Sequence, residues 1–374
     1  MKFNETGSVT MGEEKPPLQA PVERGRCGAT SVDLFSYALP EELIAKYPTE
    51  RRDGSRLMVS PRNGGPVEHR LFHQITDYFV AGDLLLLNDT RVIPARLIGK
   101  KVTGGEVELL LVRKIGDGET TQRWFAMIKP SRGIRAGMTI KFPKGLAAEI
   151  VKRVDNGWWA INLTANGVVD ALINEVGIMP LPPYIKRPST DSDRERYQTI
   201  FSKSEGAIAA PTAGLHFTDE ILSRLGDRGV EIHFITLHTG PGTFLPVRTD
   251  VIEDHAMLPE EYDIEAATFA AVSKAKRENR RVVTVGSTAT RAIEAAASDG
   301  FENPTLSGST ALFIYPGYAF KVIDGIITNF HLPRSTLIML VAAFAGRENT
   351  LKLYREAVRE RYRFFSYGDA MLIL

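Results

Sequence analysis

The sequence predicts an α/β fold, in which a mixed, largely parallel sheet forms the core and an antiparallel β-barrel is inserted into it. Two observations predict this fold. After about residue 165, segments typical of helices alternate with segments typical of strands, which favours a largely parallel sheet. Between residues 92 and 164, short apolar stretches are instead separated by Gly-rich turns, which is typical of an antiparallel barrel or sandwich. We therefore expect an α/β domain of residues 31–91 and 165–374, with a barrel of residues 92–164.

The N-terminal stretch has a different composition from the rest of the chain. Residues 1–30 scatter Lys and Glu among Pro and Gly and contain no apolar run of the kind found in a secretory signal. We expect a disordered extension here, and Met11 could also begin the chain. Cys27 is the only cysteine, so no internal disulfide or zinc thiolate cluster can form, which fits the cytosol. The net charge of +1 neither identifies nor excludes a polyanionic partner.

The first half of the chain predicts a helix start and several strands. The stretch Leu39-Pro40-Glu41-Glu42 suits a helix start, because Pro fits the first helical position and acidic residues fit the positive end of the dipole. Residues 84–87 are a continuous apolar run, which predicts a buried strand leading into the polar turn 88–91. Barrel strands are expected at residues 106–112, 124–128, 138–142 and 158–162.

The second half predicts helices and strands in alternation. Residues 337–345 predict a buried helix that ends at Gly346, and the run is far shorter than the ~20 residues that cross a membrane. Other helices are expected at residues 218–225, 264–278, 288–297 and 351–362. Strands are expected at residues 229–237, 281–285 and 370–374.

Four short polar segments in the second half point to function. They are residues 210–217, 237–244, 328–336 and 364–370, and each joins Gly or Pro to His, Thr, Asn, Arg, Ser or Asp beside an apolar run. Turns of this kind commonly carry binding and catalytic groups, because a rigid scaffold holds them in place. We expect one site assembled from distant parts of the chain, which favours an enzyme over a scaffold protein.

A fifth segment, residues 283–291, reads as a strand, a Gly286 turn and a helix start. Such a junction offers free N–H groups and a partial positive charge to an anion. The alternative is ordinary capping by Ser287 or Thr288, with Arg291 in solvent. The chain has no G-x-G-x-x-G and no Walker lysine motif, so a dinucleotide or nucleoside triphosphate is not expected.

The histidines are candidates for proton transfer, because imidazole titrates near neutrality. His216, His238 and His331 lie in the polar segments, and the alternative for each is a hydrogen-bonded structural residue. We expect no metal. His233 and His238 are five residues apart on a predicted strand and so face opposite sides.

Basic residues cluster in residues 46–56, 186–196 and 352–363, with acidic residues interleaved. Each cluster fits a solvated face better than a nucleic-acid groove. Tyrosines in or beside the last two clusters, among them Tyr184 and Tyr367, favour base stacking somewhat.

Together these residues resemble the family of S-adenosylmethionine:tRNA ribosyltransferase-isomerases of queuosine biosynthesis, over about residues 32–374. The resemblance includes the first three polar segments and long matches in the same order. These matches are Tyr47-Pro-x-Glu-Arg-Arg-Asp53, Asn88-Asp-Thr-Arg-Val-Ile-Pro-Ala-Arg96, Leu181-Pro-Pro-Tyr-Ile185, Glu195-Arg-Tyr-Gln-Thr199, Phe313-Ile-Tyr-Pro-Gly-Tyr318 and Tyr362-Arg-Phe-Phe-Ser-Tyr-Gly-Asp-Ala-Met371.

The sequence departs from the family pattern at two places. The family's His-x-Met-His-x-Glu reads His255-Ala-Met257-Leu258-Pro259-Glu260 here, so the second His is absent. The family's Gly-Thr-Thr-Ser turn reads Gly286-Ser287-Thr288-Ala289, which keeps one hydroxyl at Ser287 and loses one at Ala289.

The resemblance implies an unusual reaction. The ribosyl part of S-adenosylmethionine is transferred to 7-aminomethyl-7-deazaguanine (preQ1) at the wobble position of a tRNA with a GUN anticodon. The ribosyl ring is isomerised to give epoxyqueuosine, and adenine and methionine are released. The resemblance implies no metal and no redox cofactor, a cytoplasmic location, no membrane and a monomer.

Such a reaction needs a base near the carbon next to the sulfonium, donors facing the departing adenine, and aromatic faces for the sulfonium. We expect the residues of this site to fall into three groups. The proposed catalytic residues are His216, His238, His331, Asp89 and Asp369. The proposed cofactor-binding residues are Gly240, Gly242, Thr243, Gly286, Thr288, Arg291, Tyr315 and Phe330. The proposed substrate or tRNA contacts are Arg91, Tyr184, Arg187, Thr212, Arg334 and Tyr367.

Two other functions are compatible with parts of the sequence. One is a methyltransferase that uses the same cofactor, although no strand followed by a Gly-rich adenosyl loop opens the α/β region. The other is a non-catalytic RNA-binding module built on the barrel, which leaves the four polar segments unexplained.

Overall fold

The computed structural model describes residues 29–154, 157–244 and 247–374. The extension expected at residues 1–30 therefore lies almost wholly outside the described residues. The side chain of Thr243, a proposed cofactor contact, also lies outside them.

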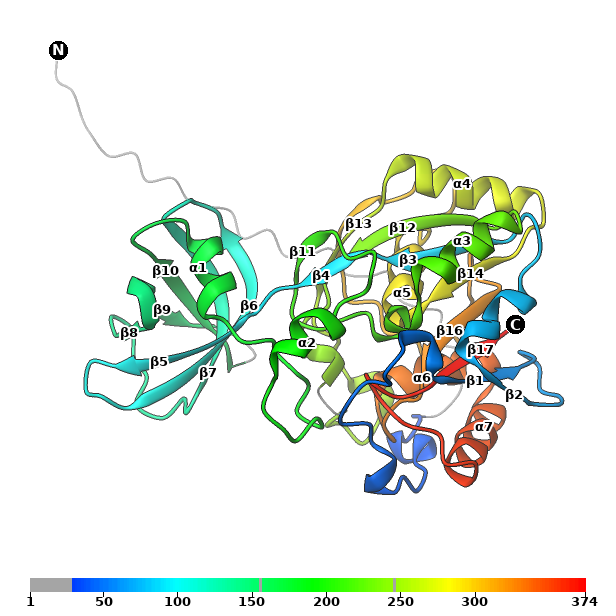
Figure 1. The fold of residues 1–374 in the computed structure, drawn as a ribbon, viewed down its shortest axis with the longest axis horizontal. Coiled ribbons are helices and arrows are strands. Elements are labelled where there is room, and N and C mark those ends of the chain that lie inside the picture. Colours follow the sequence, from blue (N-terminus) through cyan, green and yellow to red (C-terminus); the bar gives the residue numbers. More distant parts are fainter. Residues whose placement is uncertain (1–28, 155–156, 245–246) are drawn as a thin grey trace, which may run out of the picture.

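A nine-stranded mixed sheet forms the core, and its centre is parallel (Figure 1). In spatial order its strands are β15 (Ser307–Thr310), β13 (Glu260–Asp263), β12 (Glu231–Leu237), β3 (Leu84–Asn88), β14 (Val282–Val285), β16 (Gly325–Asn329), β17 (Ala370–Ile373), β1 (Arg56–Ser60) and β2 (Glu68–Leu71). Strands β12, β3, β14 and β16 are parallel neighbours, and β17 pairs parallel with β1. The remaining pairs are antiparallel.

The central strands are apolar on both faces. Every residue of β3, β14 and β16 is buried, as expected for parallel strands covered on both sides. Helices α4 (Ala266–Arg277), α5 (Gly286–Ala296), α6 (Thr336–Ala345) and α7 (Arg347–Arg359) share one apolar core with one face. Helix α3 (Asp219–Asp227) and the 3-10 helix η4 (Phe72–Tyr78) pack in the core of the other face.

Local signals explain where several helices begin and end. Thr218 caps α3 by accepting a hydrogen bond from the Ile221 N–H at 3.3 Å. Helix α6 ends at Gly346, whose φ of 81° disfavours other residues, as the sequence predicts. The prediction of a helix that starts near Leu39 is wrong. Only the 3-10 turn η2 (Glu41–Leu43) forms, because Ile44 leaves in extended conformation to bridge Phe364.

A closed six-stranded antiparallel barrel is inserted between β3 and β12 and confirms the predicted fold class. Its strands are β5 (Arg96–Lys101), β6 (Glu106–Gly116), β7 (Thr121–Lys129), β8 (Thr139–Lys141), β9 (Ala147–Arg153) and β10 (Trp159–Thr164). Alternate residues of β7 are buried, which is the pattern of a strand with one face in the barrel core. Helix α1 (Val169–Val176) continues this core through Val169 and Ile173, beyond residue 164.

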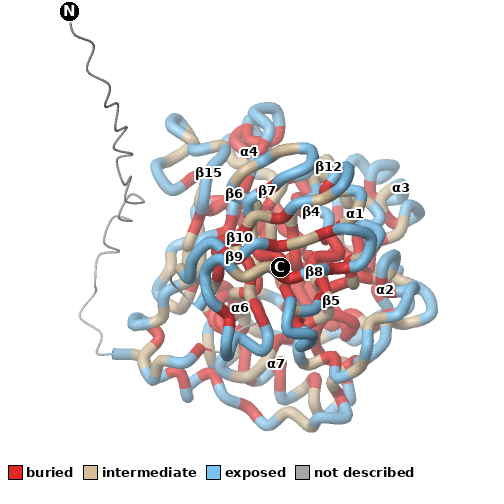
Figure 2. Tube along the Cα trace, turned by 90° about the vertical axis from the view of Figure 1, so that its left-hand side faces the viewer, coloured by how far each residue is buried: buried red, intermediate tan, exposed pale blue. Residues whose placement is uncertain are grey.

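The barrel lies at one end of the molecule, and Figure 2 looks at this end, with buried segments inside and exposed loops outside. The two-stranded sheet of β4 (Thr90–Val92) and β11 (Ser204–Ala207) marks where the chain leaves and re-enters the core, and the short helix α2 (Asp191–Arg196) lies nearby (Figure 1). In the described ranges, no helix is both long and apolar enough to span a membrane.

Candidate active site

All four polar segments reach one cavity at the carboxyl ends of the central strands. The cavity has a volume of about 70 Å³. It is lined by residues 184, 209–213, 239, 286–288, 328–329, 331–332, 335, 337 and 365–366. In open α/β sheets, ligands bind outside the carboxyl ends of parallel strands, because loops from neighbouring strands converge there. We call this space the small cavity.

The first turn of α5 faces the small cavity. Gly286 has a φ of 86° and turns the chain from β14 into the helix. No side chain caps this helix, so the capping by Ser287 or Thr288 that the sequence leaves open is not observed. The Thr288 hydroxyl instead accepts a hydrogen bond from Asn88 Nδ2 at 3.1 Å. The helix start therefore presents uncapped N–H groups beside the cavity, which is an arrangement suited to an anion.

A buried hydroxyl also faces the small cavity. Thr239 is only 3% exposed, and its Oγ1 has no hydrogen-bond partner among the described residues. Buried polar groups in proteins are almost always paired. An unpaired hydroxyl on a cavity wall is therefore a candidate contact for a ligand.

His331 lies on the wall of the small cavity with one ring nitrogen engaged. Its Nε2 lies 2.8 Å from the Thr328 hydroxyl, which itself donates to the Asn329 carbonyl at 3.4 Å. Either group can donate in the 2.8 Å contact, and Nδ1 of His331 has no hydrogen-bond partner among the described residues. Burial lowers the pKa of the His331 imidazole to about 3.

His216 is engaged on both sides. Its Nδ1 lies 2.7 Å from the Ser55 hydroxyl and its Nε2 3.3 Å from Asn329 Oδ1, and its ring packs 4.9 Å from that of Phe72. Burial is the main reason that its pKa falls to about 4. His216 therefore fits the role of a hydrogen-bonded structural residue better than His331 does.

A larger cavity lies between the barrel and the sheet, and we call it the interdomain cavity. Its volume is about 440 Å³, which falls within the range of small-molecule pockets. Barrel residues Trp124, Phe125 and Trp158 line it, and so do His238 and Gly240 of the second polar segment. Since the consecutive residues His238 and Thr239 line one cavity each, the two cavities lie on either side of one segment.

The two predicted carboxylates have different surroundings. Half-buried Asp89 accepts a hydrogen bond from the Thr236 hydroxyl at 2.7 Å, and burial raises its pKa. Asp369 is buried, and its two oxygens accept from the backbone N–H groups of Arg56 and Arg363 at 2.9 and 2.8 Å. These bonds fix the turn before β17, so they give Asp369 a structural role, and its catalytic role stays a prediction.

Arg291 is not solvated, and one of its guanidinium nitrogens, Nη2, has no hydrogen-bond partner among the described residues. It is 3% exposed and forms an ion pair with buried Glu260, and its Nε donates to the Leu312 carbonyl at 2.9 Å. The other Glu260 oxygen accepts from the Gly240 N–H at 2.8 Å, so the pair holds the second polar segment in place. Gly242 lies beside Leu258, and a Cβ on Gly242 would lie 3.4 Å from Leu258 Cβ.

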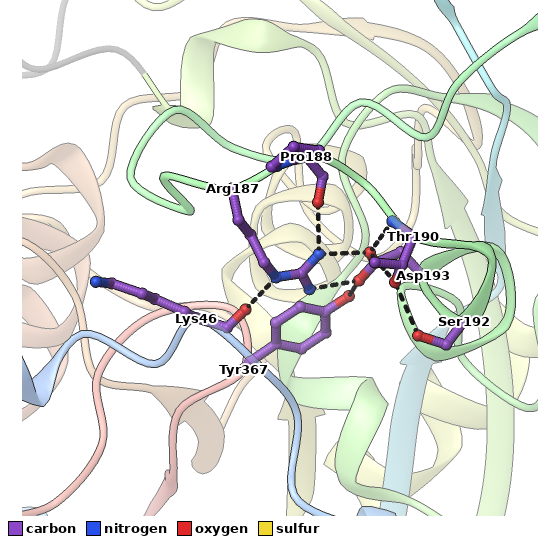
Figure 3. A network of polar contacts seen from close by, with 7 residues as sticks. All are labelled: Lys46, Arg187, Pro188, Thr190, Ser192, Asp193 and Tyr367. Carbon is purple, nitrogen blue, oxygen red and sulfur yellow. Dashed lines mark hydrogen bonds and ion pairs between the residues drawn. The ribbon is translucent and has the colours of Figure 1, made fainter.

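Arg187 and Tyr367 belong to a buried polar network (Figure 3). The Arg187 guanidinium binds Asp193 with two bonds of 2.7 and 2.8 Å and also donates to the Lys46 carbonyl at 2.8 Å. The Tyr367 hydroxyl donates to Asp193 at 2.7 Å. Both side chains are therefore engaged within the fold, and their contacts with tRNA stay a prediction.

The other predicted contacts are divided between the cavity, the core and the surface. Thr212 and Tyr184 line the small cavity, where Tyr184 stacks on Phe365 at 4.4 Å. Phe330 is fully buried among core aromatic rings, so it cannot reach a sulfonium. The remaining three residues lie away from the small cavity. The Tyr315 ring packs on Phe313, exposed Arg91 donates a hydrogen bond to the Ser202 hydroxyl, and Arg334 forms an ion pair with Asp33.

The sequence reasoning missed the aromatic wall supplied by the barrel. Trp158 and Phe125, with ring centroids 6.3 Å apart, line the interdomain cavity. The Trp158-Trp159 pair was a usable signal, because alternation along a barrel strand must turn one of two adjacent indoles outward.

Comparison with known proteins identifies the family. The family described as queuosine biosynthesis protein matches residues 32–373. Proteins of Pelobacter propionicus and Geobacter metallireducens, both named S-adenosylmethionine:tRNA ribosyltransferase-isomerase, are each 50% identical over 91% of this chain and 99% of their own length. A crystal structure of an S-adenosylmethionine tRNA ribosyltransferase from Thermotoga maritima is 36% identical, covers 91% of this chain and 100% of its own, and superposes with a TM-score of 0.51. The chain belongs to the queuosine biosynthesis protein family.

Proposed function

We propose that the chain is a tRNA-modifying transferase-isomerase. It transfers and isomerises the ribosyl moiety of S-adenosylmethionine onto 7-aminomethyl-7-deazaguanine at the wobble position of tRNA, giving epoxyqueuosine and releasing adenine and methionine. The observation that carries this proposal is the match to relatives of that name, at half identity over nearly their whole length. The convergence of four polar segments on one cavity supports it.

The small cavity fits one end of S-adenosylmethionine rather than the whole molecule, since about 70 Å³ is well below the volume of most ligand pockets. We assign the methionine end to it. The N–H groups at the start of α5 suit its carboxylate, and the unpaired Thr239 hydroxyl offers a further polar contact.

We assign the removal of the proton next to the sulfonium to His331. Its Nδ1 is free of the Thr328 bond and can accept a proton in the tautomer whose Nε2–H donates to Thr328, and burial keeps the imidazole neutral at pH 7. His216 is the weaker candidate because both its ring nitrogens already have partners.

We further propose that the tRNA has a GUN anticodon, that the reaction needs no metal or redox cofactor, and that the protein acts in the cytoplasm as a monomer. The single cysteine fits a reducing compartment. In the part of the chain that the structure describes, no group of three His, Cys, Asp or Glu side chains could hold a metal.

Product analysis tests the proposal. Purified protein is incubated with S-adenosylmethionine and tRNA carrying 7-aminomethyl-7-deazaguanine, and the nucleosides are analysed by mass spectrometry. The proposal predicts epoxyqueuosine together with equal amounts of adenine and methionine. S-adenosylhomocysteine would indicate a methyltransferase, and tRNA binding without turnover would indicate an RNA-binding module; either result rejects the proposal.

A further inference from the structure

The interdomain cavity has the walls of a nucleobase site. Phe125 and Trp158, both half-buried, line it from the barrel side with an angle of 40° between their rings, and the Arg113 guanidinium lies over the Phe125 ring at 5.1 Å. Exposed aromatic faces bind bases that leave a nucleic-acid stack, and each stacked base contributes roughly 1–3 kcal/mol. The volume of about 440 Å³ accommodates a purine-sized base with a side group.

The cavity is also acidic. Asp170, Glu205 and Glu261 line it with side chains that are 50%, 52% and 53% exposed, and the cations on its wall are Arg113 and Lys114. Lys114 pairs with Asp170 at 3.2 Å. Among the described residues, the two glutamates make only long ion pairs, Glu205 with Arg91 at 3.8 Å and Glu261 with Arg113 at 3.9 Å. Their oxygens therefore keep acceptor capacity for a ligand ammonium group.

His238 lines this cavity and has one ring nitrogen engaged by a hydroxyl. Its Nδ1 lies 2.8 Å from the Thr90 hydroxyl, which itself donates to the Ser204 carbonyl at 3.4 Å. Either group can donate in the 2.8 Å contact; in the tautomer whose Nδ1–H donates to the Thr90 oxygen, Nε2 holds the lone pair. Burial lowers the pKa of His238, while the charges of Glu261 and Asp89 oppose this shift. The imidazole is thus neutral near pH 7 and can accept a proton.

We propose that the interdomain cavity binds the extruded 7-aminomethyl-7-deazaguanine base, with its ring on Trp158 and its ammonium group facing Glu205 and Glu261. His238 Nε2 accepts one ammonium proton, which leaves a neutral amine with a lone pair for attack and a protonated imidazole. This inference rests on the proposed function and adds a separate site for the base, away from the methionine end in the small cavity.

Tryptophan fluorescence tests the stacking. All three tryptophans lie in the barrel region, and Trp159 is 7% exposed and packs in the barrel core, so it serves as the matched control. An anticodon stem-loop carrying the aminomethyl base is titrated against wild type, Trp158→Phe and Trp159→Phe. We expect quenching in wild type and Trp159→Phe and clearly weaker quenching in Trp158→Phe, in which buried Trp124, which also lines the cavity, remains. Equal quenching in the two variants overturns the proposal.

Kinetics test the placement of the base. For Trp158→Ala we expect the KM for tRNA to rise about tenfold, as the loss of one stacking contact predicts, with the KM for S-adenosylmethionine within twofold of wild type. Trp159→Phe should change neither value. If the wild-type protein forms no product, the proposed function is rejected. If the wild-type protein forms product but Trp158→Ala leaves the KM for tRNA unchanged, only this inference is rejected.

Two further variants test the charge and the proton. In Glu205→Gln/Glu261→Gln, the preference for a stem-loop with the aminomethyl base over one with the uncharged 7-cyano base should fall at least fivefold. In His238→Gln, kcat should be low at pH 7 and rise about tenfold per pH unit towards pH 9, because solvent then deprotonates the ammonium group. An unchanged preference, or a His238→Gln rate that stays flat with pH, contradicts the proposal.

Discussion

His216, His238 and His331 are all shielded from solvent, but they differ in which ring nitrogen remains available. Among the described residues, His216 has partners on both ring nitrogens, His331 has one only on Nε2, and His238 has one only on Nδ1. The sequence places each imidazole beside a Gly- or Pro-containing turn, but it cannot show these partners, because Ser55, Asn329, Thr328 and Thr90 are brought to the rings by folding.

The buried histidines predict a loss of stability on acidification. Their folded pKa values, about 4 for His216 and about 3 for His331, lie below the unfolded value, so the unfolded chain binds more protons as pH falls below about 6.5. Each should remove up to about 1.4 kcal/mol per pH unit from the free energy of unfolding. Urea unfolding at pH 7 and pH 5 measures this loss.

In His216→Asn, the drop between the two pH values should be smaller than in wild type, whereas exposed His73→Asn should leave it unchanged. If the free energy of unfolding falls equally between pH 7 and pH 5 in wild type and both variants, His216 does not control the acid sensitivity.

Asp193 predicts a large stability effect away from the cavities. Burial alone would raise its pKa, but hydrogen bonds from Arg187, Thr190 and Tyr367 hold it well below the usual range. Asp193→Asn leaves the buried guanidinium without a charged partner and should cost about 3–5 kcal/mol in urea unfolding. The control Asp191→Asn, at the exposed start of the same helix, should cost under about 0.5 kcal/mol. Similar losses in the two variants would contradict the importance of this network.

Residue roles were harder to predict than residue positions. The sequence correctly draws attention to residues 286–291, but Arg291 turns inward to Glu260, and the two are about 30 positions apart. Phe330 and Asp369 lie in segments that line the site, yet one side chain enters the aromatic core and the other binds backbone N–H groups. Which way a side chain points within a loop depends on tertiary contacts that local sequence does not specify.

At the scale of elements, the junction of β14 and α5 controls access to the helix N-terminus. Gly286→Ala places a side chain at a φ of 86°, which should cost about 1–2 kcal/mol, and adds a methyl group at the small cavity. Gly300→Ala has similar strain, at a φ of 92°, in open space after α5. Both variants should lose similar stability, but only Gly286→Ala should raise the KM for S-adenosylmethionine severalfold. Steady-state adenine release measures this, and equal KM values would contradict the assignment.

Several elements with a strong pattern were predicted well, although the buried strands β1 and β16 were missed. The apolar runs of β3, β14 and α6 and the capped α3 all appear close to their expected positions. The edge strands β2 and β15 were missed, because they are four residues long, mostly exposed and show no alternation. Such strands form only because a neighbouring strand offers its hydrogen-bonding edge.

At the scale of the whole molecule, the inserted barrel gives the sheet a second wall. The sheet alone supplies the small cavity, and the barrel adds the aromatic and acidic side of the interdomain cavity. Composition and turn spacing predict the barrel but not which of its faces meets the sheet, since that depends on the path of β4 and β11. The two cavities on either side of residues 238–239 suit a reaction that joins two substrates.

The structure of a complex with S-adenosylmethionine and a precursor-carrying anticodon stem-loop tests this arrangement most directly. We predict that the methionine carboxylate lies at the first turn of α5, that His331 faces the carbon next to the sulfur, and that the extruded base stacks on Trp158 beside His238. A nucleoside bound away from the four converging segments, or a base outside the space between barrel and sheet, would contradict the account.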